Sequence, residues 1–115
     1  MSNLTTHVLD TSQGKPAEGM KVQLFKIEEN NFFQLAEVIT NKDGRVDQKL
    51  LNSSNNVGIY ELRFFAGDYF NKENLKLTKI KFLDEITIRF GISDDTHYHV
   101  PLLISPYGYS TYRGS

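Results

Sequence analysis

Apolar and polar residues alternate along most of the chain, and this period of two predicts β-strands. The clearest case is the segment from Glu85 to Ile92, where four apolar residues alternate with four residues that are charged, polar or glycine. That pattern is typical of a strand with one buried face. Seven further strands are expected at Leu4 to Asp10, Met20 to Glu28, Phe32 to Thr40, Arg45 to Lys49, Val57 to Ala66, Thr96 to Ser105 and Tyr107 to Tyr112.

Turn residues separate these strands. Asn30-Asn31 indicates a hairpin. The segment from Asn41 to Gly44 indicates a second turn, because Asn, Asp and Gly tolerate a positive φ. One short helix is expected from Asp68 to Leu75, with Asp68 as its N-cap. About eight short strands at regular spacing predict an all-β antiparallel sandwich.

The composition excludes several classes of protein. The chain has 115 residues, which fits a single domain over residues 1–115. Because it contains no Cys, disulfides, thiolate metal sites and thiol nucleophiles are excluded. A formal net charge of −1 lacks the cationic excess that binding to nucleic-acid phosphates requires. No apolar run is long enough to span a bilayer and the first residues do not resemble a signal peptide, so we expect a cytoplasmic protein without membrane contact.

All three histidines fall inside predicted strands, so alternation assigns each of them to a face. His97 and His99 share one face of their strand, while the opposite face forms a core row that begins at Tyr98. In the first strand, His7 shares its face with Thr5. Two polar rows therefore carry imidazole. Whether they form one cluster stays open, because the sequence alone does not bring the two strands together.

Three other interpretations apply to these residues. An isolated histidine on a strand is most often a structural residue. His97 and His99 have a spacing that could ligate a metal, with a third ligand from His7 or a carboxylate elsewhere; no Asp or Glu lies nearby on that face, so no metal site is predicted. A Ser/His/Asp triad built on Ser110 or Ser115 is not supported, because the Gly-x-Ser-x-Gly nucleophile turn is absent.

Three blocks of sequence carry a resemblance to a known family. They are Leu4 to Asp10 (LTTHVLD), Asp43 to Val46 (DGRV) and His97 to Ser115 (HYHVPLLISPYGYSTYRGS). In these blocks the chain resembles the transthyretin-related 5-hydroxyisourate hydrolases, and their order and spacing fit over essentially the whole chain. The thyroid-hormone carrier transthyretin differs at four of the matching places. It lacks the final Tyr-Arg-Gly-Ser and the histidines at His7 and His99, and it has an acidic residue where Arg45 stands.

The resemblance implies a prealbumin-type sandwich of two sheets and eight strands with one short helix. It also implies a homotetramer, a dimer of dimers, with active sites at the interface between the dimers. The reaction would need no cofactor: water opens a cyclic amide of 5-hydroxyisourate to give 2-oxo-4-hydroxy-4-carboxy-5-ureidoimidazoline, a step of urate degradation. By resemblance, the site is lined by His7, Arg45, His99 and the tail from Tyr112 to Ser115.

The resemblance also implies roles for these residues. The expected catalytic residues are His7, Arg45, His99 and Ser115, and the expected substrate-binding residues are His7, Arg45 and Tyr112. One of the two histidines would deprotonate water while the other orients the water or the ring of the substrate, and Arg45 would hold the electron-rich oxygens of the substrate. The alternative is a carrier of small planar ligands such as thyroid hormone, without chemistry. A weaker alternative is a metal-binding sandwich.

Overall fold

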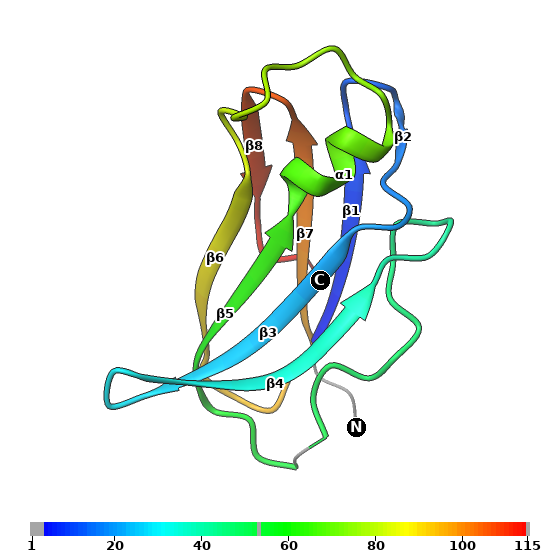
Figure 1. Ribbon diagram of the computed structural model, residues 1–115. Helices are drawn as coiled ribbons and strands as arrows, with labels where there is room; N and C mark the ends of the chain where they lie inside the picture. Colours follow the sequence, from blue (N-terminus) through cyan, green and yellow to red (C-terminus); the bar gives the residue numbers. More distant parts are fainter. Residues whose placement is uncertain (1–3, 53, 115) are drawn as a thin grey trace.

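The computed structural model describes residues 4–52 and 54–114, and its strands form two four-stranded sheets. One sheet has the order β2-β1-β7-β8 and the other the order β4-β3-β5-β6. Figure 1 shows them as the two layers of a sandwich, with the helix at one end. The elements are β1 (Leu4–Asp10), β2 (Lys15–Pro16), β3 (Lys21–Glu28), β4 (Asn31–Ile39), β5 (Gly58–Phe65), α1 (Ala66–Lys72), β6 (Glu85–Ile92), β7 (Tyr98–Ser105) and β8 (Gly108–Thr111). The predicted sandwich with one short helix is confirmed.

One pair of neighbouring strands runs parallel. β1 pairs with β7 in parallel register, from Leu4 opposite Tyr98 to Asp10 opposite Ile104, whereas the other ladders are antiparallel. The expectation of antiparallel strands throughout is therefore wrong for this pair. Parallel neighbours need a crossover connection, and here the chain passes through the whole second sheet between β1 and β7. Alternation within a strand does not reveal the direction of its neighbour.

The strand count of eight holds, although one member differs from the prediction. The two-residue strand Lys15–Pro16 was not predicted. The predicted strand from Arg45 to Lys49 is wrong, because Arg45 forms only an isolated bridge with His7. Beyond that bridge the side chains are mostly exposed and the backbone forms no ladder. Polar composition with a single half-buried valine gives this segment no face to bury against a sheet.

The helix begins two residues earlier than predicted. Asp68 lies in the first turn of α1 and is not its cap; the N-cap position is Phe65, without a side-chain hydrogen bond. Packing sets the start instead: the amide of Gly67 donates a 2.8 Å hydrogen bond to the carbonyl of Asp84, and a Cβ at Gly67 would collide with the Asp84 carboxylate. No helix within the described residues is long and apolar enough to cross a membrane.

The core lies between the two sheets and follows the predicted alternation. Tyr98, Val100 and Leu102 of β7 are buried, as are Leu4 and Val8 of β1. Burying alternate positions of a strand leaves the others on the outer face. Thr5 and His7 on β1 and His99 on β7 therefore face outward from the same sheet.

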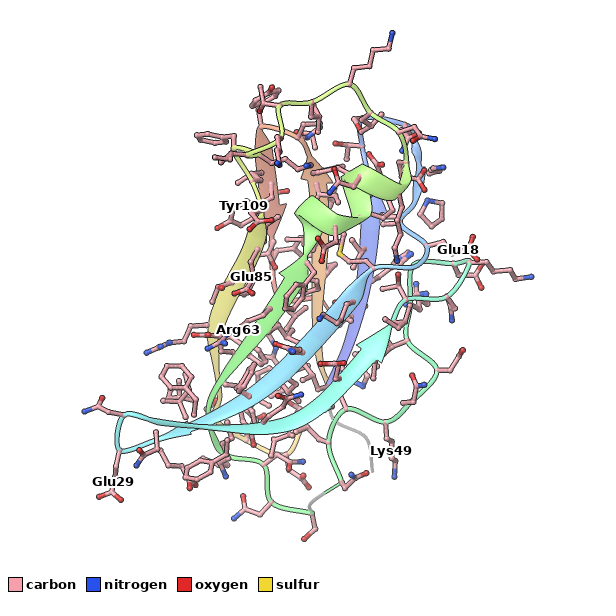
Figure 2. The ribbon with its side chains drawn as sticks, in the orientation of Figure 1. Glu18, Glu29, Lys49, Arg63, Glu85 and Tyr109 are labelled. Atoms are coloured by element: carbon pink, nitrogen blue, oxygen red, sulfur yellow. The ribbon has the colours of Figure 1, made fainter. Side chains whose placement is uncertain are left out.

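The outer face of the second sheet carries a separate ionic cluster. Glu61 is only 5% exposed, and its carboxylate accepts hydrogen bonds from Arg63 Nε at 2.7 Å and Arg89 Nη2 at 3.2 Å. Arg63, labelled in Figure 2, also stacks on Phe25, with its guanidinium carbon 4.1 Å from the ring centroid. One carboxylate thus pairs with two guanidinium groups on this face, which belongs to the other sheet than the outward face of β1 and β7.

Candidate active site

The pairing of β1 with β7 brings the two rows of imidazole together. In the parallel register Thr5 lies opposite His99, and His7 lies opposite Pro101. His7 and His99 thus occupy neighbouring strands, offset by one outward-facing position. Both are half-buried, while His97, just before β7, is exposed. The cluster that the sequence left open is present in the structure.

The hydroxyl of Thr5 lies between two histidines. Its Oγ1 is 2.7 Å from His99 Nδ1 and 2.8 Å from His97 Nε2. A threonine hydroxyl has a single proton, so it donates a hydrogen bond to one of these nitrogens and accepts a hydrogen bond from the other. This contact was not predicted: Thr5 belongs to the row of His7 by alternation, but only the strand register shows that it meets the other row.

The ring of His7 is held by the turn that precedes Arg45. Its Nε2 lies 2.8 Å from the carbonyl oxygen of Asp43. A carbonyl oxygen can only accept a hydrogen bond, so Nε2 carries the proton. In the neutral imidazole the lone pair is then on Nδ1, which makes that nitrogen the acceptor of His7.

The predicted turn from Asn41 to Gly44 positions Arg45. The Asn41 side-chain oxygen accepts hydrogen bonds from the amides of Asp43 at 2.9 Å and Arg45 at 3.1 Å. Gly44 has a φ of 75°, and its carbonyl accepts a 2.8 Å hydrogen bond from the amide of Val8. Arg45 is thereby fixed beside β1. Its exposed guanidinium has no ion pair or hydrogen bond with any residue in 4–52 or 54–114.

The surroundings of His99 favour its neutral form. Burial lowers the pKa of His99 below the ordinary value of 6.5, and repulsion by the charge of Arg45, and by His7 and His97 when they are protonated, lowers it further. A neutral imidazole can accept a proton near pH 7. Within the described part of the chain, no three His, Asp or Glu side chains are grouped so that they could hold a metal ion.

The C-terminal tail is bound along β7. β8 ends at Thr111, one residue before the predicted end, and the ladder is interrupted opposite Pro101, which has no amide proton to donate. It resumes at Gly114, whose amide donates a 2.7 Å hydrogen bond to the carbonyl of His99. Arg113 donates to Thr96 Oγ1 at 3.0 Å and stacks 4.0 Å from the ring centroid of Tyr98.

The structure does not bring every predicted site residue together. Tyr112 is 60% exposed and lines a pocket of about 250 Å³ together with Tyr98 and Val100, whose side chains are buried. Among the residues that the structure describes, it makes no hydrogen bond or ring contact with the two histidines on the outer face. Ser115 lies outside the described residues. The roles expected for Tyr112 and Ser115 stay predictions.

The chain is similar to proteins of one known family in sequence and in fold. The model of the HIUase/Transthyretin family matches residues 4–114. The 5-hydroxyisourate hydrolase 2 of Rhizobium meliloti is 54% identical over 97% of this chain and 95% of its own length. The structure of Klebsiella pneumoniae 5-hydroxyisourate hydrolase is 37% identical, with a TM-score of 0.83 over the full length of both chains. Transthyretin from Sparus aurata has a TM-score of 0.87 over 99% of this chain and 97% of its own, at 20% identity, which shows the shared fold. The chain therefore belongs to the HIUase/Transthyretin family.

Proposed function

We propose that this protein hydrolyses 5-hydroxyisourate to 2-oxo-4-hydroxy-4-carboxy-5-ureidoimidazoline. The observation that carries the proposal is the placement of His7, Arg45 and His99 on one outer sheet face, where two strands and a turn converge. These groups supply the base and the cation that hydrolysis of a cyclic amide requires. The 54% identity to a named hydrolase, against 20% to a transthyretin, supports the enzyme over the carrier.

The acid–base steps are assigned to the two imidazoles. His99, kept neutral by burial and by nearby positive charge, takes a proton from water while the water oxygen bonds to the amide carbon. His7 orients that water by accepting a hydrogen bond from its second hydrogen at Nδ1, the nitrogen left without a proton by the Asp43 contact. When the carbon–nitrogen bond breaks, the His99 imidazolium returns its proton to the leaving nitrogen. No cofactor takes part.

Arg45 is assigned to charge stabilisation. The attacked carbonyl becomes an oxyanion, and a guanidinium offers permanent charge with two parallel donors. The absence of another partner for Arg45 among the described residues leaves its donors for the substrate. Lysine should replace it poorly, because a single ammonium cannot reproduce the two-donor geometry.

Assembly completes the site in this proposal. The face that carries His7, Arg45 and His99 is open to solvent in the single chain, whereas small-molecule sites bury most of their ligand. A homotetramer, a dimer of dimers, would cover this face at the interface between dimers and enclose the substrate there with Tyr112 and Ser115. The single domain over residues 1–115 and the cytoplasmic location stay predictions.

The test uses the purified protein and freshly generated 5-hydroxyisourate, followed by its ultraviolet absorbance. The absorbance should decay much faster with protein than without, and a chelator should leave the rate unchanged. Decay at the uncatalysed rate together with saturable thyroxine binding would establish the carrier instead. Loss of activity with chelator would support the metal-binding alternative. Light scattering should give the mass of four chains.

A further inference from the structure

Thr5 contacts the proposed base, His99, and links it to His97. Neither Thr5 nor His97 has a role in the mechanism above. We propose that Thr5 and His97 are positioning residues that set the tautomer of His99 and carry its proton between the site and solvent. The proposal rests on the proposed function. Its basis is the single hydroxyl that bridges His99 Nδ1 at 2.7 Å and His97 Nε2 at 2.8 Å. The two contacts give a continuous chain from a half-buried imidazole to an exposed one.

The bridge determines which nitrogen of His99 can act as the base. If Nδ1 holds the proton, it donates to Thr5 Oγ1, the Thr5 hydroxyl donates to His97 Nε2, and His99 Nε2 keeps its lone pair. If the hydroxyl points the other way, Nδ1 accepts from Thr5 and Nε2 is protonated, so neither nitrogen can take a proton from water. The productive arrangement therefore requires His97 to present a lone pair at Nε2, with its own proton on Nδ1.

The same chain can move charge out of the site. After His99 Nε2 accepts the proton of water, the Nδ1–H bond of His99 breaks and its proton passes to Thr5 Oγ1, while the Thr5 O–H bond breaks and that proton passes to His97 Nε2. His99 is then neutral and His97 is the imidazolium. The reverse transfer restores the proton to Nδ1 when Nε2–H is given to the leaving nitrogen, so protons and charges balance over the cycle.

The charges around the two histidines favour this transfer. His99 lies within the electrostatic reach of Arg45 and His7, which disfavour a further positive charge there. His97 is exposed, so water can solvate its imidazolium. One cation faces it from the tail, because Arg113 Nη2 donates to the His97 carbonyl at 3.3 Å, and solvent screens that repulsion at an exposed position.

Substitutions of Thr5 test the bridge directly. Thr5→Val keeps the shape of the side chain and removes the hydroxyl. We therefore expect kcat to fall about 10- to 100-fold with little change in KM, at the lower end of the contributions that general acid–base catalysis makes. The pH profile of kcat should also shift. Thr5→Ser keeps the hydroxyl and should restore both. Wild-type kcat and an unchanged pH profile in Thr5→Val would overturn the proposal.

The matched control is Thr6→Val. The Thr6 hydroxyl donates a 2.7 Å hydrogen bond to the Val100 carbonyl from the buried face of the same strand. Its loss should lower the melting temperature without moving the pH profile. If Thr6→Val and Thr5→Val have the same effects on stability and on the pH profile, Thr5 is only structural.

Two further measurements separate this proposal from the proposed function. Nitrogen-15 NMR of the imidazoles in the wild-type protein should show the neutral His99 with its proton on Nδ1, and Thr5→Val should lose that preference; a proton on Nε2 would overturn the tautomer assignment even if the protein hydrolyses no 5-hydroxyisourate. His97→Ala should lower kcat, and added imidazole should restore part of it. Full activity in His97→Ala would remove His97 from the proton path.

Discussion

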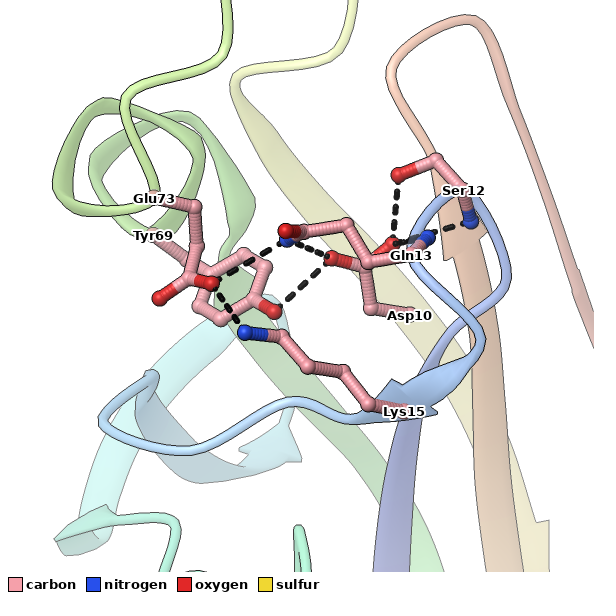
Figure 3. A network of polar contacts seen from close by, with 6 residues as sticks. All are labelled: Asp10, Ser12, Gln13, Lys15, Tyr69 and Glu73. Atoms are coloured by element: carbon pink, nitrogen blue, oxygen red, sulfur yellow. Dashed lines mark hydrogen bonds and ion pairs between the residues drawn. The ribbon is translucent and has the colours of Figure 1, made fainter.

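The hydroxyl of Tyr69 in α1 donates a 2.8 Å hydrogen bond to the carboxylate of Asp10 at the end of β1, and both side chains are buried. Figure 3 shows the network around this contact, formed by Asp10, Ser12, Gln13, Lys15, Tyr69 and Glu73. It joins the helix between β5 and β6 of the second sheet to the strand that carries His7. The contact thus connects the two layers at one end of the sandwich.

Replacing Tyr69 should destabilise the protein in a pH-dependent way. Burial opposes the charge of Asp10, but hydrogen bonds from Ser12, Gln13 and Tyr69 outweigh it and hold the carboxyl pKa below its ordinary value. Tyr69→Phe keeps the ring and leaves the carboxylate one donor short. We expect the free energy of unfolding at pH 7, measured with urea, to fall by about 1–3 kcal/mol, as for a buried hydrogen bond to a charged group.

The pH dependence of this loss in stability follows from the direction of the Asp10 pKa shift. Because the folded pKa of Asp10 is lowered, its contribution is present above the unfolded pKa of about 3.9 and is lost as the pH falls through the folded pKa. The gap in stability between wild type and Tyr69→Phe should therefore narrow below pH 4. Tyr60→Phe, which removes a buried hydrogen bond from Tyr60 to a neutral carbonyl, is the control. A gap that is constant down to pH 2 would contradict the role of the carboxylate charge.

Gly44 should be indispensable to the turn that holds Arg45. Its φ of 75° is unfavourable for other residues, and a Cβ there would collide with the carbonyl oxygen of Val8. Gly44→Ala should break the hydrogen bond from the amide of Val8 and displace Arg45, lowering both kcat/KM and the melting temperature. Gly14→Ala is a matched control, because Gly14 has a φ of 64° with nothing within 4 Å of its Cβ. It should cost only the backbone strain of about 1–2 kcal/mol and leave kcat/KM unchanged.

The faces of the strands could be predicted from the sequence, but their neighbours could not. Alternation places His7 and His99 on outward faces because a core must bury the other residues of each strand. The contact between the two rows depends on the parallel register of β1 and β7, which lie at opposite ends of the chain. No local pattern encodes that register. The bridge from Thr5 to both histidines follows from it and was missed for the same reason.

The turn before Arg45 and the C-terminal tail could also be predicted only in part. Asn41 to Gly44 could be predicted as a turn, since local backbone preferences decide it. The strand expected after it does not form beyond the single bridge between Arg45 and His7, because the mostly polar residues that follow have no apolar face to bury against the sheet. At the C-terminus, the interruption of the ladder opposite Pro101 follows from the missing amide proton. The register that returns Gly114 to His99 could be found only in the structure.

The pKa of His99 should respond to the charge of Arg45. The pKa of His99 is lowered by burial first and by the charge of Arg45 next. Removing that charge in Arg45→Gln should raise the His99 pKa toward 6.5, as followed by NMR titration of its ring protons. In the unfolded chain the pKa of histidine is about 6.5, which is higher than the pKa of His99 in the folded protein. The contribution of His99 to the free energy of unfolding therefore declines as the pH falls through about 6.5. An unchanged titration in Arg45→Gln would mean that the guanidinium lies too far from the imidazole to serve the same substrate.

Gly114 should be required for the position of His99. A Cβ at Gly114 would lie 2.7 Å from His99 Cδ2, closer than such atoms approach one another, and 3.2 Å from His99 Cβ, which is a tight contact. Gly114→Ala should push the imidazole aside or release the tail from β7, and kcat should fall by about 10²-fold, as when a base is misplaced by roughly 1 Å. Stability should change little, since the contact is at the end of the ladder.

Gly108→Ala is the matched control for that substitution. Gly108 lies in β8 of the same sheet, and the nearest atom to a Cβ there is Ser105 Oγ at 3.8 Å, an ordinary contact. It should therefore leave kcat unchanged. Deleting residues 112–115 should remove most of the activity. If Gly114→Ala also keeps wild-type kcat, the tail does not hold the His99 ring, and the loss in the deletion variant has to come from Tyr112 or Ser115 themselves. Comparing the two alanine variants with the deletion thus distinguishes positioning of the base from direct contact with the substrate.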